Sequence, residues 1–179
     1  MPQPTSEQAA FVLRTIWLPA YQHEHPLTKA VIAAIPADKA DYRPDAIVKS
    51  AIDLAWHIVA AEMRFMDGVA SGAFDYGNST RPESIQTPAD VVAWYSDRFA
   101  ANVERLEATP AEKLLTSIDF RGLFTRPAIV YLQSGLVHSI HHRGQLSMYL
   151  RPMGARVPSI YGESFDAREA RERAQKTSG

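Results

Sequence analysis

The stretch Val137-His138-Ser139-Ile140-His141-His142-Arg143-Gly144-Gln145-Leu146 is the most informative part of this sequence, and it lies in a segment that we predict to be helical. On a helix, His138 and His142 are one turn apart and lie on the same face. Two neutral imidazoles so placed can bind one divalent cation, with Zn–N distances of about 2.0–2.1 Å. The spacing alone is also compatible with a solvated pair of histidines.

A third ligand has to come from elsewhere, and His57 is the leading candidate, in the run Ala55-Trp56-His57-Ile58-Val59-Ala60-Ala61-Glu62. In a helical bundle, side chains on facing helices build metal sites. Three histidines that leave coordination positions open describe a catalytic site better than a structural one, because structural zinc is usually closed by four ligands. The alternative is that His57 is a hydrogen-bonded core histidine.

A histidine near the start of a second helix, followed by H-x-x-x-H-R-G-Q-L on a fourth helix, resembles the DinB/YfiT superfamily of four-helix-bundle metalloproteins. The matching residues are His57, His138 and His142 with the motif 143–146. The segment 153–162 is similar to that family's usual exit from the last helix. The resemblance covers about residues 5–163, and H-R-G-Q is its most specific part.

This resemblance implies an all-α fold, an antiparallel four-helix bundle with long loops and a short charged C-terminal segment. It also implies that the three histidines bind one divalent metal, nickel or zinc. Several members of the superfamily are thiol-dependent transferases or isomerases that use bacillithiol, mycothiol or glutathione. We therefore expect a metal-dependent thiol S-transferase acting on a small-molecule substrate. The alternatives are a metal-dependent hydrolase on the same site, or a non-catalytic metal-binding protein of a stress or damage response.

Length and composition indicate one domain over residues 1–179, with its core at about 5–163. Nineteen basic and twenty acidic residues give a net charge of −1, and no basic stripe points to nucleic acid. There is no cysteine, which excludes disulfides, a protein thiolate nucleophile and a cysteine-ligated zinc site. A thiol chemistry would therefore need sulfur from a cosubstrate.

The N-terminal sequence lacks the basic and apolar regions of a signal peptide. No apolar run approaches the ~20 residues that a membrane span needs. We expect a cytoplasmic protein without a membrane partner.

Two helix starts can be located in the first half of the chain. Thr5-Ser6-Glu7-Gln8 has the form of a capping box and predicts the first helix. Pro19 and Pro26 should kink or divide that helix before Ala34-Ile35-Pro36 ends it. Ser50 predicts the start of the second helix, which should end at a long loop from Gly72 to Pro82.

The second half gives two more helices and an irregular connection. Thr87-Pro88 predicts the third helix start, with proline at the first helical position. Residues 109–126 should hold a short helical turn and a hairpin around Arg121-Gly122. The fourth helix is expected to open at Thr125 or Arg126, before Pro127, and to run to about Arg151. Residues 166–173 predict a surface helix or frayed tail.

Other residues are candidates for contacts around the metal or the substrate. Arg143 could form a surface ion pair or bind the carboxylate of an anionic cosubstrate. Gln145 could orient a ligand or a water. Glu62 and Asp53 are possible outer carboxylates or general bases, or ordinary exposed residues. Tyr161 and Trp56 could line the pocket, although core packing is the better interpretation of Trp56.

Three further positions carry expectations. His141 lies about 100° around the helix from His142, so it should be an outer or surface residue. His23 and His25 are expected to form a solvated pair rather than ligands. Gly144 costs about 1 kcal/mol in a helix relative to alanine, which close approach of another helix or chain would explain. With the apolar residues around it, Gly144 suggests a homodimer.

Overall fold

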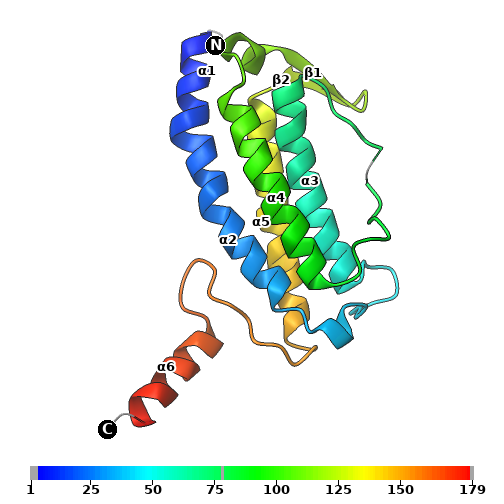
Figure 1. The fold of residues 1–179 in the computed structure, drawn as a ribbon, viewed down its shortest axis with the longest axis vertical. Helices are drawn as coiled ribbons and strands as arrows, with labels where there is room; N and C mark the ends of the chain where they lie inside the picture. The colour runs from blue at the N-terminus through cyan, green and yellow to red at the C-terminus, as the bar shows by residue number, and fades with distance from the viewer. Residues whose placement is uncertain (1–3, 78, 178–179) are drawn as a thin grey trace.

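The computed structural model describes residues 4–77 and 79–177, and most of them are helical. The elements in chain order are α1 (Ser6–Val12), a π-helical turn (Leu13–Trp17), α2 (Leu18–Ala33), a 3₁₀ turn (Ala37–Lys39), α3 (Ala51–Ser71), α4 (Pro88–Glu107), a second 3₁₀ turn (Ala111–Leu115), β1 (Ser117–Phe120), β2 (Phe124–Pro127), α5 (Val130–Leu150) and α6 (Phe165–Thr177). The helical rod from α1 to α2 forms a bundle with α3, α4 and α5 (Figure 1). The predicted all-α four-helix bundle is confirmed.

The directions of the helices follow from the long connection between α3 and α4, which runs along the side of the bundle (Figure 1). This connection returns the chain to its starting end, so α3 and α4 run parallel to each other. Trp56 of α3 packs on Trp94 of α4, and farther along both helices the Asn102 side chain donates to the Met63 carbonyl. The residue numbers of the two helices therefore increase in the same direction, as in a parallel pair.

In contrast, α3 and α5 run antiparallel, since His57 lies beside His142 and Phe65 beside Tyr131. The expected antiparallel arrangement thus holds for this pair but not for α3 with α4.

The first helix is divided where a proline was expected to disturb it. Thr5 and Gln8 form the predicted capping box. The π turn ends at Trp17, two residues before Pro19. In a regular α-helix the ring of Pro19 would clash with the carbonyl of residue i−4, here Thr15 within that turn. The wider π turn accommodates this ring. Pro26 stays inside α2 without ending it.

The predicted starts of the second and third helices are confirmed. The Ser50 side chain accepts a hydrogen bond from the Asp53 backbone and caps α3, which Gly72 ends at φ 87°. Thr87 and Asp90 form a capping box at the start of α4, with Pro88 in the first turn. These caps satisfy backbone N–H groups that a helix start otherwise leaves unpaired.

The predicted hairpin is present, and it corrects the start of the fourth helix. Strand β2 includes Thr125, Arg126 and Pro127, which were expected to open that helix. Pro127 is paired with Ser117, and the next two backbone N–H groups donate to residues 116 and 114. Because strand pairing holds residues 124–127 extended and these two bonds fix the turn that follows, α5 begins only at Val130.

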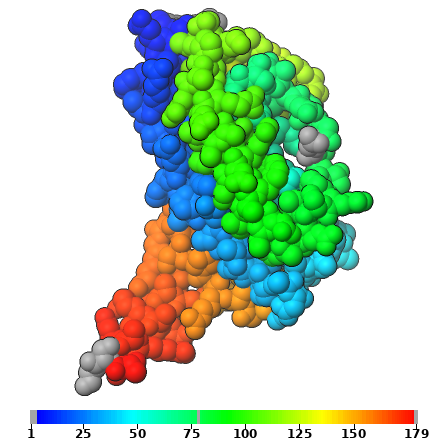
Figure 2. Space-filling view, in the orientation of Figure 1, coloured from blue at the N-terminus to red at the C-terminus, as the bar shows by residue number. Residues whose placement is uncertain are grey.

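The C-terminal helix α6 projects from the bundle (Figures 1 and 2). None of its described residues is buried, as expected for a charged surface helix. The core lies between the other helices, and α5 packs mainly against α3. Within the described part of the chain, no helix is long and apolar enough to cross a membrane.

Candidate metal centre

The antiparallel packing of α3 against α5 brings the three predicted histidines together. His57 is in the second turn of α3, and His138 and His142 are on successive turns of α5. The ring of His57 lies 4.8 Å from that of His138 and 4.7 Å from that of His142, centroid to centroid, and the two α5 rings are 4.5 Å apart. One ring nitrogen of each lies within 4.8 Å of the others.

This trio is the only group of three or more possible metal-binding side chains among the described residues. All three imidazoles are half-buried. His141 is exposed and is not in the group, although its ring lies 4.9 Å from that of His142. The structure thus places His141 at the surface, as expected for a residue on the neighbouring face of α5.

The surroundings of the trio keep two of its histidines, His57 and His138, neutral. Burial lowers the pKa of His57 to about 4, with smaller effects from His142 and from the cations Lys49 and Arg64. Burial likewise lowers the pKa of His138 to about 4, and the neighbouring histidines add to that shift. A neutral imidazole is the form that binds a metal. His57 and His138 are therefore in their ligand form at neutral pH.

The hydrogen bonds of the two α5 histidines fit a metal site. His142 Nδ1 is 2.9 Å from Gln145 Oε1, so this nitrogen donates and Nε2 keeps a free lone pair. Such a partner fixes the tautomer and orientation of a metal-binding histidine. Nδ1 of His138 is buried and has no partner among the described residues. A cation would satisfy that nitrogen, so the donor set is suitable for one divalent ion with nitrogen ligands.

Two hollows lie beside the trio. The first, the His57 cavity, has a volume of about 420 Å³ and lies between the start of α3 and the connection that follows that helix. The second, the His138 groove, is about 550 Å³ and lies along α5 beside Arg126, Val137, His138 and His141. Volumes of this size accommodate small molecules. The trio is thus open to ligands from two sides.

Arg143 is not at the surface, which corrects the expected surface ion pair. Only 1% of the residue is exposed. Its guanidinium forms an ion pair with Glu24 at 2.6 Å and donates to the Tyr161 hydroxyl at 2.5 Å and to Thr28 at 3.3 Å. Its donors are used inside the bundle, so the alternative contact with a cosubstrate carboxylate is not available to it.

Glu62 is buried as well, which corrects the interpretation as an ordinary exposed residue. It lies between α3 and α4 and accepts a 2.5 Å hydrogen bond from the Tyr95 hydroxyl. Burial raises the pKa of its carboxyl to about 7, against the lowering effects of Ser139, Tyr95 and Arg143. Glu62 is not in the metal-binding group, so its position supports a role within the core polar network and not as a ligand.

This buried carboxyl predicts a pH dependence of stability. The folded state holds the Glu62 proton up to about pH 7, whereas the unfolded state loses it near 4.5, so the free energy of unfolding falls as pH rises between these values. We expect Glu62→Gln to gain roughly 3 kcal/mol relative to wild type between pH 4.5 and 8, from about 1.4 kcal/mol per pKa unit.

Urea unfolding of the metal-free proteins at several pH values measures this difference. His25, His57 and His138 have pKa values lowered to about 4, so their contribution to stability rises with pH from about 4 to 6.5. Both proteins contain these histidines, and the comparison cancels their effect. Parallel pH profiles for the two proteins would contradict the prediction.

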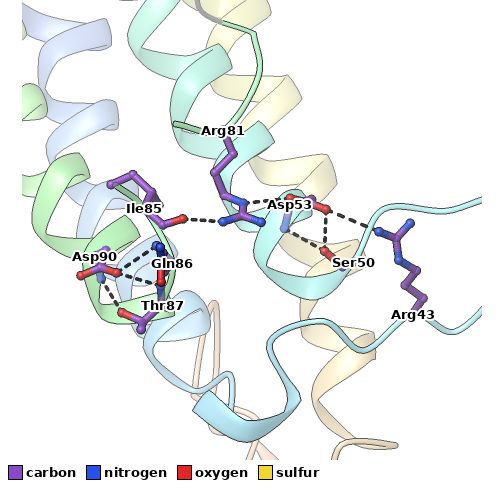
Figure 3. A network of polar contacts seen from close by, with 8 residues as sticks. All are labelled: Arg43, Ser50, Asp53, Arg81, Ile85, Gln86, Thr87 and Asp90. Carbon is purple, nitrogen blue, oxygen red and sulfur yellow. Dashed lines mark hydrogen bonds and ion pairs between the residues drawn. The ribbon is translucent and has the colours of Figure 1, made fainter. Parts of the chain in front are cut away.

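The other candidates are distributed over several places. Tyr161 donates to Glu24 at 2.8 Å and does not line either hollow beside the trio. Trp56 packs on Trp94 in the core, as expected, and also lines the His57 cavity. Asp53 accepts hydrogen bonds from Ser50 and Arg81 (Figure 3).

The expectation for His25 was wrong, and one of the two explanations for Gly144 is excluded. His25 stacks on Phe99 at 3.9 Å and is half-buried, so only His23 is solvated. Gly144 meets nothing within 4 Å, so no other helix of this chain explains it. The close approach occurs instead at Gly135, where an added Cβ would lie 2.6 Å from the Tyr21 hydroxyl and 2.7 Å from Phe65.

Several residues near the trio were missed by sequence reasoning. Glu24 and Thr28 lie one helical turn apart, and both contact Arg143. Nothing in the sequence of the first predicted helix indicates that these two residues contact the fourth helix. Lys49 and Arg81 reach the His57 cavity from irregular segments, where no periodicity predicts the direction of a side chain.

Comparison with known proteins gives the family. The model of the DinB family matches residues 15–175. The chain belongs to the DinB family. The match includes α2 to α5 and all three histidines of the trio.

Individual relatives of this DinB-family chain agree with that result. The protein YjoA of Bacillus subtilis (strain 168) is 30% identical over 132 residues, which are 72% of this chain and 82% of YjoA. The crystal structure of the B. subtilis DinB-like protein YjoA superposes with a TM-score of 0.67 at 23% identity, covering 80% of this chain and 96% of that one. A DinB-like protein from Bacillus cereus ATCC 10987 gives 0.69 at 24% identity, covering 81% and 95%. At this identity the structures show a shared fold.

Proposed function

We propose that this DinB-family chain is a metal-dependent enzyme that binds one divalent ion, nickel or zinc, through His57, His138 and His142. The observation that carries the proposal is the half-buried trio, whose ring nitrogens lie within 4.8 Å of one another. Three protein ligands leave positions open for a substrate, as in catalytic zinc sites. A divalent ion bound there would lower the pKa of a coordinated thiol or water, making a nucleophile at neutral pH.

The residues of the chain itself would orient and protect this site. Gln145 holds the ring of His142, and the buried Arg143 on the next position anchors α5 to α2 through Glu24. Burial keeps His57 and His138 unprotonated. The His57 cavity gives a small-molecule substrate an approach to the trio.

We further propose that the reaction is the transfer of a low-molecular-weight thiol to an electrophile. The chain has no cysteine, so the sulfur nucleophile would enter with the cosubstrate. The sulfur would form a bond to the electrophilic carbon while the bond between that carbon and its leaving group breaks. The leaving group would depart with the electron pair of that bond, and the thiol proton would pass to the leaving group or to solvent. No residue of the chain would be consumed.

The test is a panel of bacillithiol, mycothiol, glutathione and coenzyme A added to the cobalt-substituted protein. We expect one thiol to give a sulfur-to-metal charge-transfer band and to support conjugation of a model electrophile, with a rate that rises with pH to a limit below the free-thiol pKa near 8.5. A panel with neither band nor conjugation would contradict the thiol reaction. Hydrolysis of model esters would then favour the hydrolase, and no turnover would favour a metal-binding stress protein.

We also propose a homodimer that associates through the outer face of α5. Val137 and Met148 are exposed on this face, at 57% and 72%, and Gly144 between them is open. The only Lys, Arg, Asp or Glu of α5 is Arg143, which is buried, so the exposed face has none of these charges. Light scattering should give twice the chain mass of 19.9 kDa, whereas the chain mass itself at micromolar concentration would contradict the dimer.

A further inference from the structure

The His57 cavity is lined by more cations than its single carboxylate can neutralise. Arg43, Lys49 and Arg81 line it together with Asp53. Asp53 binds Arg81 at 2.9 Å and Arg43 at 3.6 Å (Figure 3), and Ser50 donates to it as well. These contacts hold the pKa of Asp53 below its usual value, so this carboxyl is charged. Three positive charges then face one negative charge.

Lys49 is the cation of the His57 cavity whose charge no carboxylate neutralises. It forms no ion pair within residues 4–77 and 79–177. Its charge is close enough to His57 to contribute to the lowered pKa of that imidazole. Since Asp53 is shared by the two arginines, the ammonium of Lys49 is the charge in the cavity that an incoming anion would meet without competition.

Trp56 provides an independent indication of a ligand. It lines the His57 cavity and also a second hollow between α3 and α4, beside Trp94. Only 4% of the residue is exposed, and its indole Nε1 is buried without an acceptor in the described chain. A buried donor without a partner costs about 1–3 kcal/mol. An acceptor oxygen of a bound molecule would satisfy this N–H group.

We propose that the His57 cavity binds an oxyanion group, a carboxylate or a phosphate, of the small-molecule substrate, and directs the rest of that molecule to the histidine trio. Lys49 and the two arginines supply the positive charge, and the indole N–H of Trp56 donates a hydrogen bond. The sequence suggested Arg143 for binding the carboxylate of an anionic cosubstrate, and this cavity takes that role instead. The direction toward the trio rests on the proposed function, whereas anion binding does not.

The first experiment uses the metal-free protein labelled with ¹⁵N, with succinate and inorganic phosphate as probes. The chain has three tryptophans, and Trp56→Phe assigns the indole N–H signal of Trp56. We expect one or both anions to shift this signal in a saturable way, and the neutral analogue succinamide to leave it unchanged. The stronger of the two anions identifies the group that the cavity prefers. A signal that neither anion moves at tens of millimolar would overturn the proposal.

Charge variants separate a built site from general attraction to the surface. Lys49→Gln should weaken the binding of the anion about three- to tenfold, the effect of one partly exposed charge. Asp53→Asn removes the only carboxylate of the cavity and should tighten binding by a similar factor, which a structural defect would not do. Lys113→Gln, an exposed lysine elsewhere, is the matched control and should have no effect. Equal weakening by Lys49→Gln and Lys113→Gln would contradict the proposal.

The second experiment tests the direction toward the trio. In the cobalt-loaded protein, the paramagnetic ion should broaden the proton signals of bound succinate more than zinc does. Equal line widths of the succinate signals in the cobalt-loaded and zinc-loaded proteins would place the anion away from the histidines. That result would overturn the proposal that the cavity directs the substrate to the trio. A protein that takes up no metal would instead remove the proposed function, and the Trp56 signal would still decide anion binding.

Discussion

Substitution of His142 by alanine is expected to weaken the binding of a divalent ion by more than about 100-fold, because loss of an outer partner alone typically costs 10–100-fold. His142 is one of only three proposed ligands, and its ring lies within 5 Å of both others. The same loss is expected for His57→Ala and His138→Ala. Competition with a chromophoric chelator measures the affinity of each variant for zinc and nickel.

Two further variants give the matched comparisons for this prediction. His141→Ala should bind metal like the wild type, since His141 lies outside the trio. Gln145→Ala should be intermediate, about 10–100-fold weaker, because the hydrogen bond that orients His142 is lost. Metal content in the His142→Ala protein equal to that of the wild type would show that the trio is not the metal site.

Substitution of Arg143 by methionine is expected to lower the free energy of unfolding by about 3–5 kcal/mol. The side chain of Arg143 is 2% exposed and that of Glu24 is 10% exposed, so removal of the arginine leaves a buried carboxylate without its counter-charge. Tyr161 and Thr28 also lose a donor. Urea unfolding followed by circular dichroism measures the change.

The double variant Arg143→Met with Glu24→Leu should recover much of that loss, since well-packed apolar residues often replace a buried ion pair at little cost. The matched control is Arg173→Ala, which removes an exposed pair with Glu169 on α6 and should change stability by less than about 1 kcal/mol. A loss below 1 kcal/mol for Arg143→Met would mean that the buried pair does not stabilise the fold.

The sequence predicted those parts of the fold that depend on local chemistry. The caps at Thr5, Ser50 and Thr87 are each defined within four residues, and all three helices begin where expected. The predicted start of α5 was wrong because pairing in the β1–β2 hairpin holds residues 124–127 extended, and a turn follows before the helix begins. A local pattern around Pro127 does not reveal that its partner is Ser117.

The trio of histidines could be predicted because its residues form a motif, but the surroundings could not. The fourth helix is apolar on more than one side, so periodicity does not show that Arg143 faces inward or that Gly144 faces outward. The partners of Arg143 are Glu24 and Tyr161, which come from segments far apart in the chain. The parallel direction of α3 and α4 likewise depends on the path of a long loop.

The central claim is that these three histidines together bind one divalent ion, and a metal titration of the folded wild-type chain tests it most directly. Protein purified without chelator or affinity-tag metal is titrated with zinc or nickel, beside a variant in which His57, His138 and His142 are all alanine. We expect one ion per wild-type chain and none in the triple variant, with both proteins equally helical. A wild-type chain that binds no ion, or a triple variant that binds as much, would contradict the claim.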